Sequence, residues 1–200
     1  ITHFFNPPRY MRLVEIISSD KTNKDMIDYV DYFLTNILGK NVVHAKDTPN
    51  FIANRIGVYG MNVTLHEARE RNLSIEDVDA LTGTLIGRPK SATFRTADVV
   101  GLDTMCFVSK TAYDKCVDDP EREIFKLPEY INKMVENNWL GQKTKQGFYK
   151  KIDKGVIHSL DLKTLEYKPM KKKKYGAFAI AKENTYLRDR LYSVVRSDDI

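Results

Sequence analysis

The chain has 200 residues, of which 42% are hydrophobic and 30% charged, a balance typical of a globular protein with one sizeable core or two small ones. No apolar run approaches the 18 residues of a membrane span, and no signal peptide is recognisable. The net charge of +5 gathers in four lysines at 171–174 rather than along a helix with interleaved aromatics, which favours a solvated loop over a nucleic-acid interface.

The first seventeen residues contain the most informative pair of side chains. The run Leu-Val-Glu-Ile-Ile at 13–17 has the composition of a strand, so Glu15 shares a face with two apolar neighbours and points towards an interior. A buried carboxylate needs a cation or a donor, and His3, across a turn at Pro7–Pro8, is the nearest titratable candidate. A carboxylate that holds one imidazole nitrogen leaves the other free to act as a general base. The alternative is a surface histidine near a salt-bridged Glu15 on an edge strand.

A helix and a second strand are predicted next. Thr22 followed by Asp25 resembles a capping box, and Gly39 is placed to end the helix. Residues 41–45 have strand composition, so a strand, a helix and a strand indicate the end of an α/β layer. The apolar residues expected to pack on the sheet are Met26, Val30, Phe33 and Ile37.

From residue 48 onwards the chain is predicted to be helical. Thr48 is the expected N-cap and Pro49 the first helical residue. Asn54 lies off the apolar stripe of this helix and therefore faces something other than the core. Further helices are predicted from Ser74, over 103–117 and over 127–135, which together indicate a bundle. The stripe is expected to consist of Ile52, Ile56, Tyr59 and Val63.

After residue 147 the composition changes. Residues 148–158 read as a hairpin with a Gly155 turn, 160–167 add a candidate strand, and an amphipathic helix is expected over 184–195. The two cysteines, Cys106 and Cys116, lack metal-ligand spacing and predict reduced thiols of a cytoplasmic protein without a metal site.

Several motifs in one order resemble the 3-hydroxyacyl-CoA dehydrogenase family over about residues 1 to 150. The resemblance implies a mainly α chain, with a helical bundle of this family's C-terminal, 6-phosphogluconate dehydrogenase-like type after a small α/β remnant of a Rossmann domain. It divides the chain into a remnant of the NAD-binding domain (1–47), a helical substrate-binding and dimerisation domain (48–150), and a tail with a hairpin, a basic loop and the start of a further helical segment (151–200). The motifs are His3-Phe-Phe-Asn-Pro with Glu15, Lys46 to Arg55, Gly87-Arg88-Pro89, Ala97 to Asp103 and Gly141 to Tyr149.

The resemblance also implies a function, the NAD-dependent oxidation of (3S)-3-hydroxyacyl-CoA to 3-oxoacyl-CoA in fatty acid beta-oxidation. In that family His3 would remove the 3-hydroxyl proton and Glu15 would orient it. Asn54 would help hold the substrate's oxygen, and Asn6 would lie near the nicotinamide. The implied partners are an acyl-CoA substrate and a second copy of the chain, joined through the helical domain, with no nucleic acid, membrane or metal.

Two departures from the family pattern stand out. Asn50 occupies a position where the family usually has glycine, and residues 90–95 replace a usual Gly-Pro-Phe. The second variant resembles the long bacterial and archaeal enzymes in which an enoyl-CoA hydratase domain is fused to the dehydrogenase.

The sequence lacks the Gly-x-Gly-x-x-Gly turn that holds a dinucleotide pyrophosphate at a helix N-terminus. We therefore expect the chain to be a fragment, with the nucleotide-binding half before Ile1, and to be inactive by itself. The alternative function is that of a non-catalytic helical dimerisation or interaction module.

Overall fold

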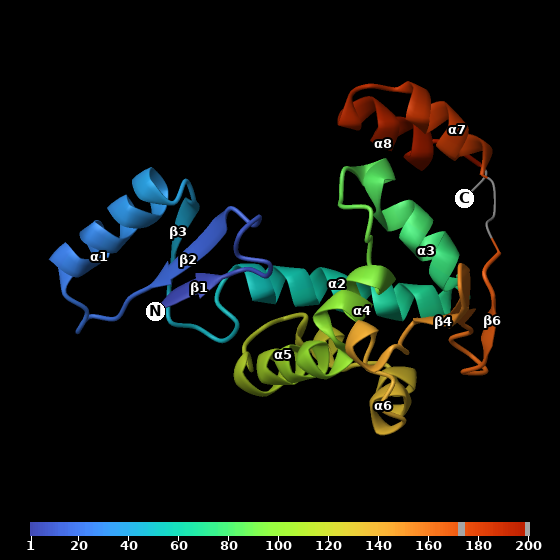
Figure 1. The fold of residues 1–200 in the computed structure, drawn as a ribbon, viewed down its shortest axis with the longest axis horizontal. Coiled ribbons are helices and arrows are strands. Elements are labelled where there is room, and N and C mark those ends of the chain that lie inside the picture. The colour runs from blue at the N-terminus through green and yellow to red at the C-terminus, as the bar shows by residue number, and fades with distance from the viewer. Residues whose placement is uncertain (172–174, 199–200) are drawn as a thin grey trace.

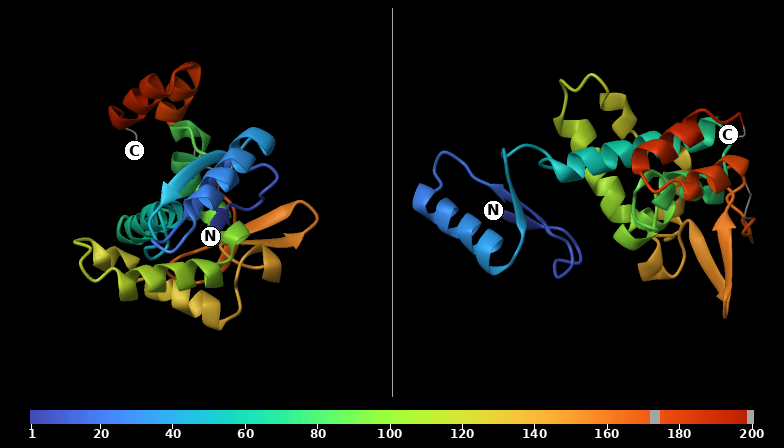
Figure 2. Two further views of the ribbon diagram at one scale, coloured as in Figure 1. Left: turned by 90° about the vertical axis from the view of Figure 1, so that its left-hand side faces the viewer. Right: turned by 90° about the horizontal axis from the view of Figure 1, so that it is seen from above.

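The computed structural model describes residues 1–171 and 175–198. A small α/β unit lies at one end of the long helix α2 (Ala53–Glu70), and the helices between residues 75 and 136 gather around the rest of α2 (Figure 1). Figure 2 shows the same separation from above, with the α/β unit joined to the helical unit where α2 begins. No helix within the described ranges is long and apolar enough to cross a membrane.

The α/β unit is a three-stranded sheet covered on one face by a helix. Its strands lie in the order β1-β2-β3, with β1 antiparallel and β3 parallel to the central β2. The bounds of β2 and β3 confirm the strands predicted at 13–17 and 41–45. The elements are β1 (Thr2–Phe4), β2 (Leu13–Ile17), α1 (Lys24–Tyr32), the π-helical turn η1 (Phe33–Ile37) and β3 (Asn41–Ala45).

Helix α1 differs from its prediction at both its cap and its buried face. The N-cap is Asn23, whose side chain accepts from the backbone N–H of Asp25 and Met26, while Thr22 accepts from Ser19 instead. The predicted stripe is correct at Val30 and wrong at its other three positions, because the sheet contacts a neighbouring face of the helix. The residues that pack against β2 are Ile27, Val30 and Leu34, whereas Met26, Phe33 and Ile37 are exposed.

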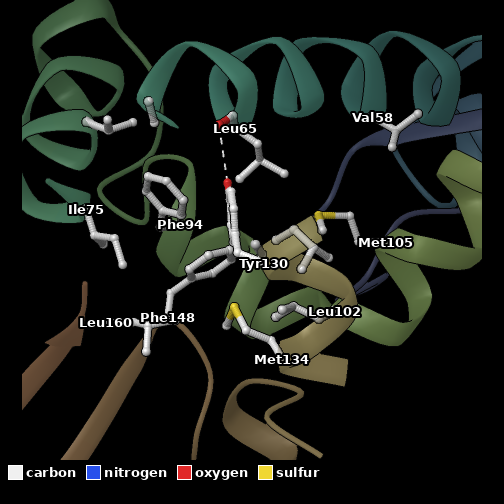
Figure 3. Close-up of a cluster of buried hydrophobic side chains, with 14 of the residues drawn as sticks. Val58, Leu65, Ile75, Phe94, Leu102, Met105, Tyr130, Met134, Phe148 and Leu160 are labelled. Atoms are coloured by element: carbon white, nitrogen blue, oxygen red, sulfur yellow. Dashed lines mark hydrogen bonds between the residues drawn. The ribbon is translucent and has the colours of Figure 1, made fainter. Parts of the chain in front are cut away.

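The helical unit is a bundle with one main core, as predicted. Ser74 caps α3 by accepting from the backbone N–H of Asp77, which confirms the predicted helix start. Phe94, Tyr130 and Phe148 meet at the centre of the core, where the Tyr130 hydroxyl donates to the Leu65 carbonyl (Figure 3). Its elements are α2, α3 (Ile75–Thr82), η2 (Thr84–Ile86), α4 (Phe94–Val100), α5 (Leu102–Lys115), η3 (Arg122–Phe125), α6 (Glu129–Glu136) and η4 (Gln142–Thr144).

The buried face of α2 also differs from the prediction. Ile52 and Ile56, two members of the predicted stripe, are 40% and 67% exposed. Asn54 lies four residues before Val58 on the helix, so it falls on the buried side rather than off it. Asn54 lies at the start of α2, so it is on the same side as the buried residues but nearer to the α/β unit. The buried residues of α2 are Val58, Asn62, Leu65 and Ala68.

The C-terminal part begins with a second antiparallel sheet in the order β4-β5-β6. It confirms the predicted hairpin, and Leu160 of this sheet reaches the main core (Figure 3). Two short helices follow, of which only the second was predicted. Three of the four clustered lysines, 172–174, lie outside the described residues. The elements are β4 (Tyr149–Asp153), β5 (Val156–Leu160), β6 (Tyr167–Pro169), α7 (Gly176–Glu183) and α8 (Leu187–Val195).

A buried carboxylate attaches the second sheet to the bundle. Asp98 of α4 accepts from the backbone N–H of Phe148 at 2.8 Å and of Tyr149 at 2.9 Å. Burial raises the pKa of Asp98 to about 6 in spite of these two donors. Asp79 of α3 accepts from the Tyr149 hydroxyl, so two acidic side chains hold the start of β4.

Candidate active site

The structure brings His3 and Glu15 together as predicted from the strand pattern. The two residues lie directly opposite each other in the antiparallel pair β1–β2, so their side chains share one face of the sheet. His3 Nδ1 is 2.7 Å from Glu15 Oε2. The Glu15 side chain is only 1% exposed, whereas 25% of the His3 side chain is exposed. The pair therefore joins a buried carboxylate to an imidazole that solvent or a ligand can reach.

The second oxygen of Glu15 contacts the helical unit. Glu15 Oε1 accepts from the backbone N–H of Ile52 at 3.0 Å and of Ala53 at 2.9 Å, at the N-terminus of α2. The first N–H groups of a helix have no intrahelical partner, and a carboxylate there is favoured by the helix dipole. Glu15 thus caps α2, a role that the sequence pattern had predicted for Thr48.

The predicted start of α2 at Thr48 and Pro49 is wrong. Residues 49–52 form a turn in which Asn50 and Phe51 adopt left-handed backbone angles, φ 64° and 51°, and the helix begins only at Ala53. Thr48 accepts through its backbone carbonyl from the Phe51 N–H at 3.0 Å, and the N-cap position of α2 has no side-chain hydrogen bond of its own. The turn points the first N–H groups of α2 at Glu15.

Two aromatic rings flank His3. The centroid of its imidazole lies 4.6 Å from the ring of Phe5 and 5.6 Å from the ring of Phe51. Because an ionised carboxylate only accepts, its bond to Nδ1 places the ring proton there and leaves a lone pair on Nε2. Among the described residues nothing is hydrogen-bonded to Nε2. The arrangement can therefore take up a proton at Nε2, with Glu15 stabilising the imidazolium.

The two asparagines predicted at the site have different positions. Asn54 is the second residue of α2 and is partly buried, directly after the Ala53 N–H that donates to Glu15. Asn6 is exposed in the segment after β1, where the Asn6–Pro7 peptide bond is cis. Sequence reasoning missed the backbone donors of α2 and the rings of Phe5 and Phe51. The signal for a turn at Asn50 was that the family usually has glycine at this position.

Comparison with known families matches both segments of the chain from which these residues come. The description "3-hydroxyacyl-CoA dehydrogenase, C-terminal domain" matches residues 51–151, half of the chain, and "3-hydroxyacyl-CoA dehydrogenase, NAD binding domain" matches residues 1–48. The chain belongs to the 3-hydroxyacyl-CoA dehydrogenase family. Glu15 links the two matched segments, because its carboxylate belongs to the first segment and the N–H donors of Ile52 and Ala53 belong to the second.

Individual members of the 3-hydroxyacyl-CoA dehydrogenase family give the same result. The "Probable 3-hydroxyacyl-CoA dehydrogenase" of Bacillus subtilis is 50% identical over 198 residues, which are 99% of this chain and 25% of that protein. A protein of the same name from Deinococcus radiodurans is 46% identical over 149 residues, 74% of this chain and 42% of that protein. The chain thus spans a quarter to less than half of these relatives.

A solved structure supports the fold assignment. The crystal structure of (S)-3-hydroxybutyryl-CoA dehydrogenase PaaH1 from Ralstonia eutropha superposes with a TM-score of 0.64 at 32% identity. The match covers 73% of this chain and 50% of that one. It confirms the predicted helical bundle of this family, preceded by a Rossmann-like remnant. NAD is the cofactor that membership of this NAD-binding family implies.

Proposed function

We propose that this chain is the part of an NAD-dependent 3-hydroxyacyl-CoA dehydrogenase of fatty acid beta-oxidation that supplies the catalytic base and contacts the acyl-CoA substrate. The supporting observation is the 2.7 Å hydrogen bond between His3 Nδ1 and the buried Glu15, with Nε2 left free. His3 Nε2 takes the proton of the 3-hydroxyl group as the carbonyl forms at carbon 3. When bound, NAD would supply the hydride acceptor for that carbon.

The other proposed site residues support this step. Glu15 fixes the tautomer of His3 and stabilises its charge after proton transfer. Asn54, at the start of α2, holds the substrate's oxygen through its amide, and Asn6 lies near the nicotinamide. The sequence has no glycine turn for the pyrophosphate, so these residues account for only part of a dinucleotide site.

A chimera tests this function directly. The 198 matched residues of the Bacillus subtilis relative are replaced by the corresponding residues of this chain, to which they are 50% identical. We expect the chimera to form NADH from (3S)-3-hydroxyacyl-CoA with activity of the same order as the unaltered relative. A chimera that folds and binds NAD but does not oxidise this substrate would contradict the proposal.

The 200-residue chain alone is expected neither to bind NAD measurably nor to oxidise 3-hydroxyacyl-CoA, because its sequence contains no Gly-x-Gly-x-x-Gly turn. Isothermal titration calorimetry with NAD measures the binding, and the chimera in the same assay serves as the positive control. A saturable binding isotherm for the chain alone would show this prediction to be wrong.

We also propose that two copies associate through the helical unit. Several large apolar side chains of this unit are exposed, and exposed apolar faces often form interfaces between copies. Sedimentation at tens of micromolar is expected to give a dimeric mass, and Phe107→Glu on α5 is expected to yield the monomer. Val195→Glu, on α8 outside the unit, should leave the dimer intact, and a monomeric wild-type chain would contradict the prediction. The exposed residues are Ile56, Val99, Val100, Phe107 and Val117.

The proposal also covers the division of the chain, its location and one alternative function. The chain is divided near residues 47 and 150, which the limits of the two family descriptions, 1–48 and 51–151, support. A cytoplasmic location is supported by the free thiols of Cys106 and Cys116. The alternative of a non-catalytic interaction module predicts a folded, dimeric and inactive chimera. The fused hydratase domain stays a prediction from residues 90–95.

A further inference from the structure

The turn between β3 and α2 contains Asn50, which has an unusual backbone angle and also forms a side-chain hydrogen bond. Asn50 has φ 64°, a left-handed conformation that glycine adopts freely and asparagine more readily than most other residues. Either residue therefore satisfies the backbone of this turn. Only asparagine adds a side-chain bond, from Asn50 Nδ2 to the backbone carbonyl of Val108 on α5, at 2.9 Å.

This bond lies close to the donors that hold Glu15. Ile52 and Ala53, two and three residues after Asn50, direct their N–H groups at Glu15 Oε1. Phe51, between them and Asn50, is one of the two rings beside His3. The position of the turn on α5 thus determines where the donors of Glu15 and one neighbour of the His3 ring are placed.

We infer that Asn50 is a positioning residue for the His3–Glu15 pair. Its amide ties the turn to α5 and thereby holds the N–H groups of Ile52 and Ala53 on Glu15 Oε1. With Oε1 fixed in this way, Oε2 stays directed at His3 Nδ1. This inference rests on the proposed function only in that the pair is taken to be the catalytic base. The geometry itself can be tested without activity.

Asn50→Gly is the informative variant, because it keeps the left-handed turn and removes only the amide. The matched control is Asn72→Gly, the same exchange at a left-handed residue, φ 54°, just beyond the other end of α2. Amide hydrogen exchange on the 200-residue chain should show the Ile52 and Ala53 protons exchanging about tenfold faster in Asn50→Gly, the effect expected from losing one hydrogen bond. Exchange at these two positions should not change in Asn72→Gly.

The His3 ring provides a readout that a merely structural asparagine would not affect. The NMR signal of the His3 Nδ1 proton should weaken or broaden in Asn50→Gly and persist in Asn72→Gly. Asn50→Asp tolerates the same backbone angle but cannot donate to the Val108 carbonyl, so it should behave like Asn50→Gly. Wild-type exchange and an unchanged Nδ1 signal in either Asn50 variant would overturn the inference.

Activity of the chimera separates this inference from the proposed function. Asn50→Gly should lower kcat with little change in KM, and adding it to Glu15→Gln should cause no further loss. A further, multiplicative loss in the double variant would show that Asn50 acts independently of Glu15 and would overturn the inference. An inactive unsubstituted chimera would contradict the proposed function, while the exchange and NMR results would still decide the role of Asn50.

Discussion

His3→Ala is expected to lower kcat of the chimera by about 10²- to 10⁴-fold, the range that general-base catalysis contributes. The imidazole accepts the hydroxyl proton only as the transition state forms, so KM should change little. Steady-state rates of NADH formation with a (3S)-3-hydroxyacyl-CoA measure both quantities. A loss confined to KM would mean that His3 binds the substrate and does not act as the base.

Glu15→Gln should reduce kcat nearly as much, for a reason visible in the structure. Three donors converge on the Glu15 carboxylate, one from His3 and one each from the backbone of Ile52 and Ala53. A glutamine amide has one accepting oxygen and one donating nitrogen. It can therefore satisfy either the helix terminus or the His3 ring in its present tautomer, but not both.

The double variant tests whether the two residues act as one unit. Groups that act together give strongly non-additive losses, so His3→Ala with Glu15→Gln should be scarcely less active than His3→Ala alone. His44→Ala is the matched control, because His44 also contacts a carboxylate, that of Asp31 on α1 at 2.6 Å, but this pair is largely exposed to solvent. It should leave kcat unchanged. Independent, multiplicative losses for His3 and Glu15 would refute the catalytic pair.

This pair could be predicted from the sequence because its geometry is local. His3 and Glu15 are twelve residues apart on two strands joined by one short connection, and strand alternation alone determines which face Glu15 occupies. Ser74 as the cap of α3 was predictable for the same reason, since its partner Asp77 is three residues away. Both predictions depended only on neighbouring residues.

The buried face of α2 was not predictable, because it depends on contacts between distant segments. Asn62, at the centre of that face, is fully buried and donates to Ser109 Oγ of α5 at 3.1 Å. A hydrophobic pattern does not identify a polar residue as buried. The prediction therefore placed the apolar Ile56, on the opposite side of α2, in the buried stripe. Which face of α2 is buried depends on where α5 packs against it.

The predicted start of α2 was wrong for a related reason. Capping rules assume that the acceptor is a side chain next to the helix, and Thr48 fits that rule. Here the acceptor is Glu15, which is 37 residues upstream of Ile52 and belongs to the other matched segment. The same carboxylate thus caps a helix and orients a base, which connects the arrangement of the two units to the chemistry of the site.

Gly147→Ala is expected to destabilise the chain strongly, by about 3 kcal/mol or more, at the upper end of what overpacking causes. A Cβ atom at Gly147 would overlap Asp98 Oδ1 and would lie 2.6 Å from the Cα of Gly141. The Asp98 carboxylate cannot move aside without losing the N–H groups of Phe148 and Tyr149, which it holds in a buried position. The substitution should therefore loosen β4 from α4.

Gly57→Ala is the matched control, and its expected effect has the opposite sign. Gly57 lies inside α2 with no atom within 4 Å of the position of a Cβ, so alanine should stabilise the chain by about 0.5–1 kcal/mol through its higher helix propensity. Urea unfolding of both variants and the wild-type chain measures the free energy of unfolding. If Gly147→Ala were as stable as the wild type, Asp98 could not be what fastens the second sheet to the bundle. The opposite signs separate a steric effect at Gly147 from a general response to replacing glycine.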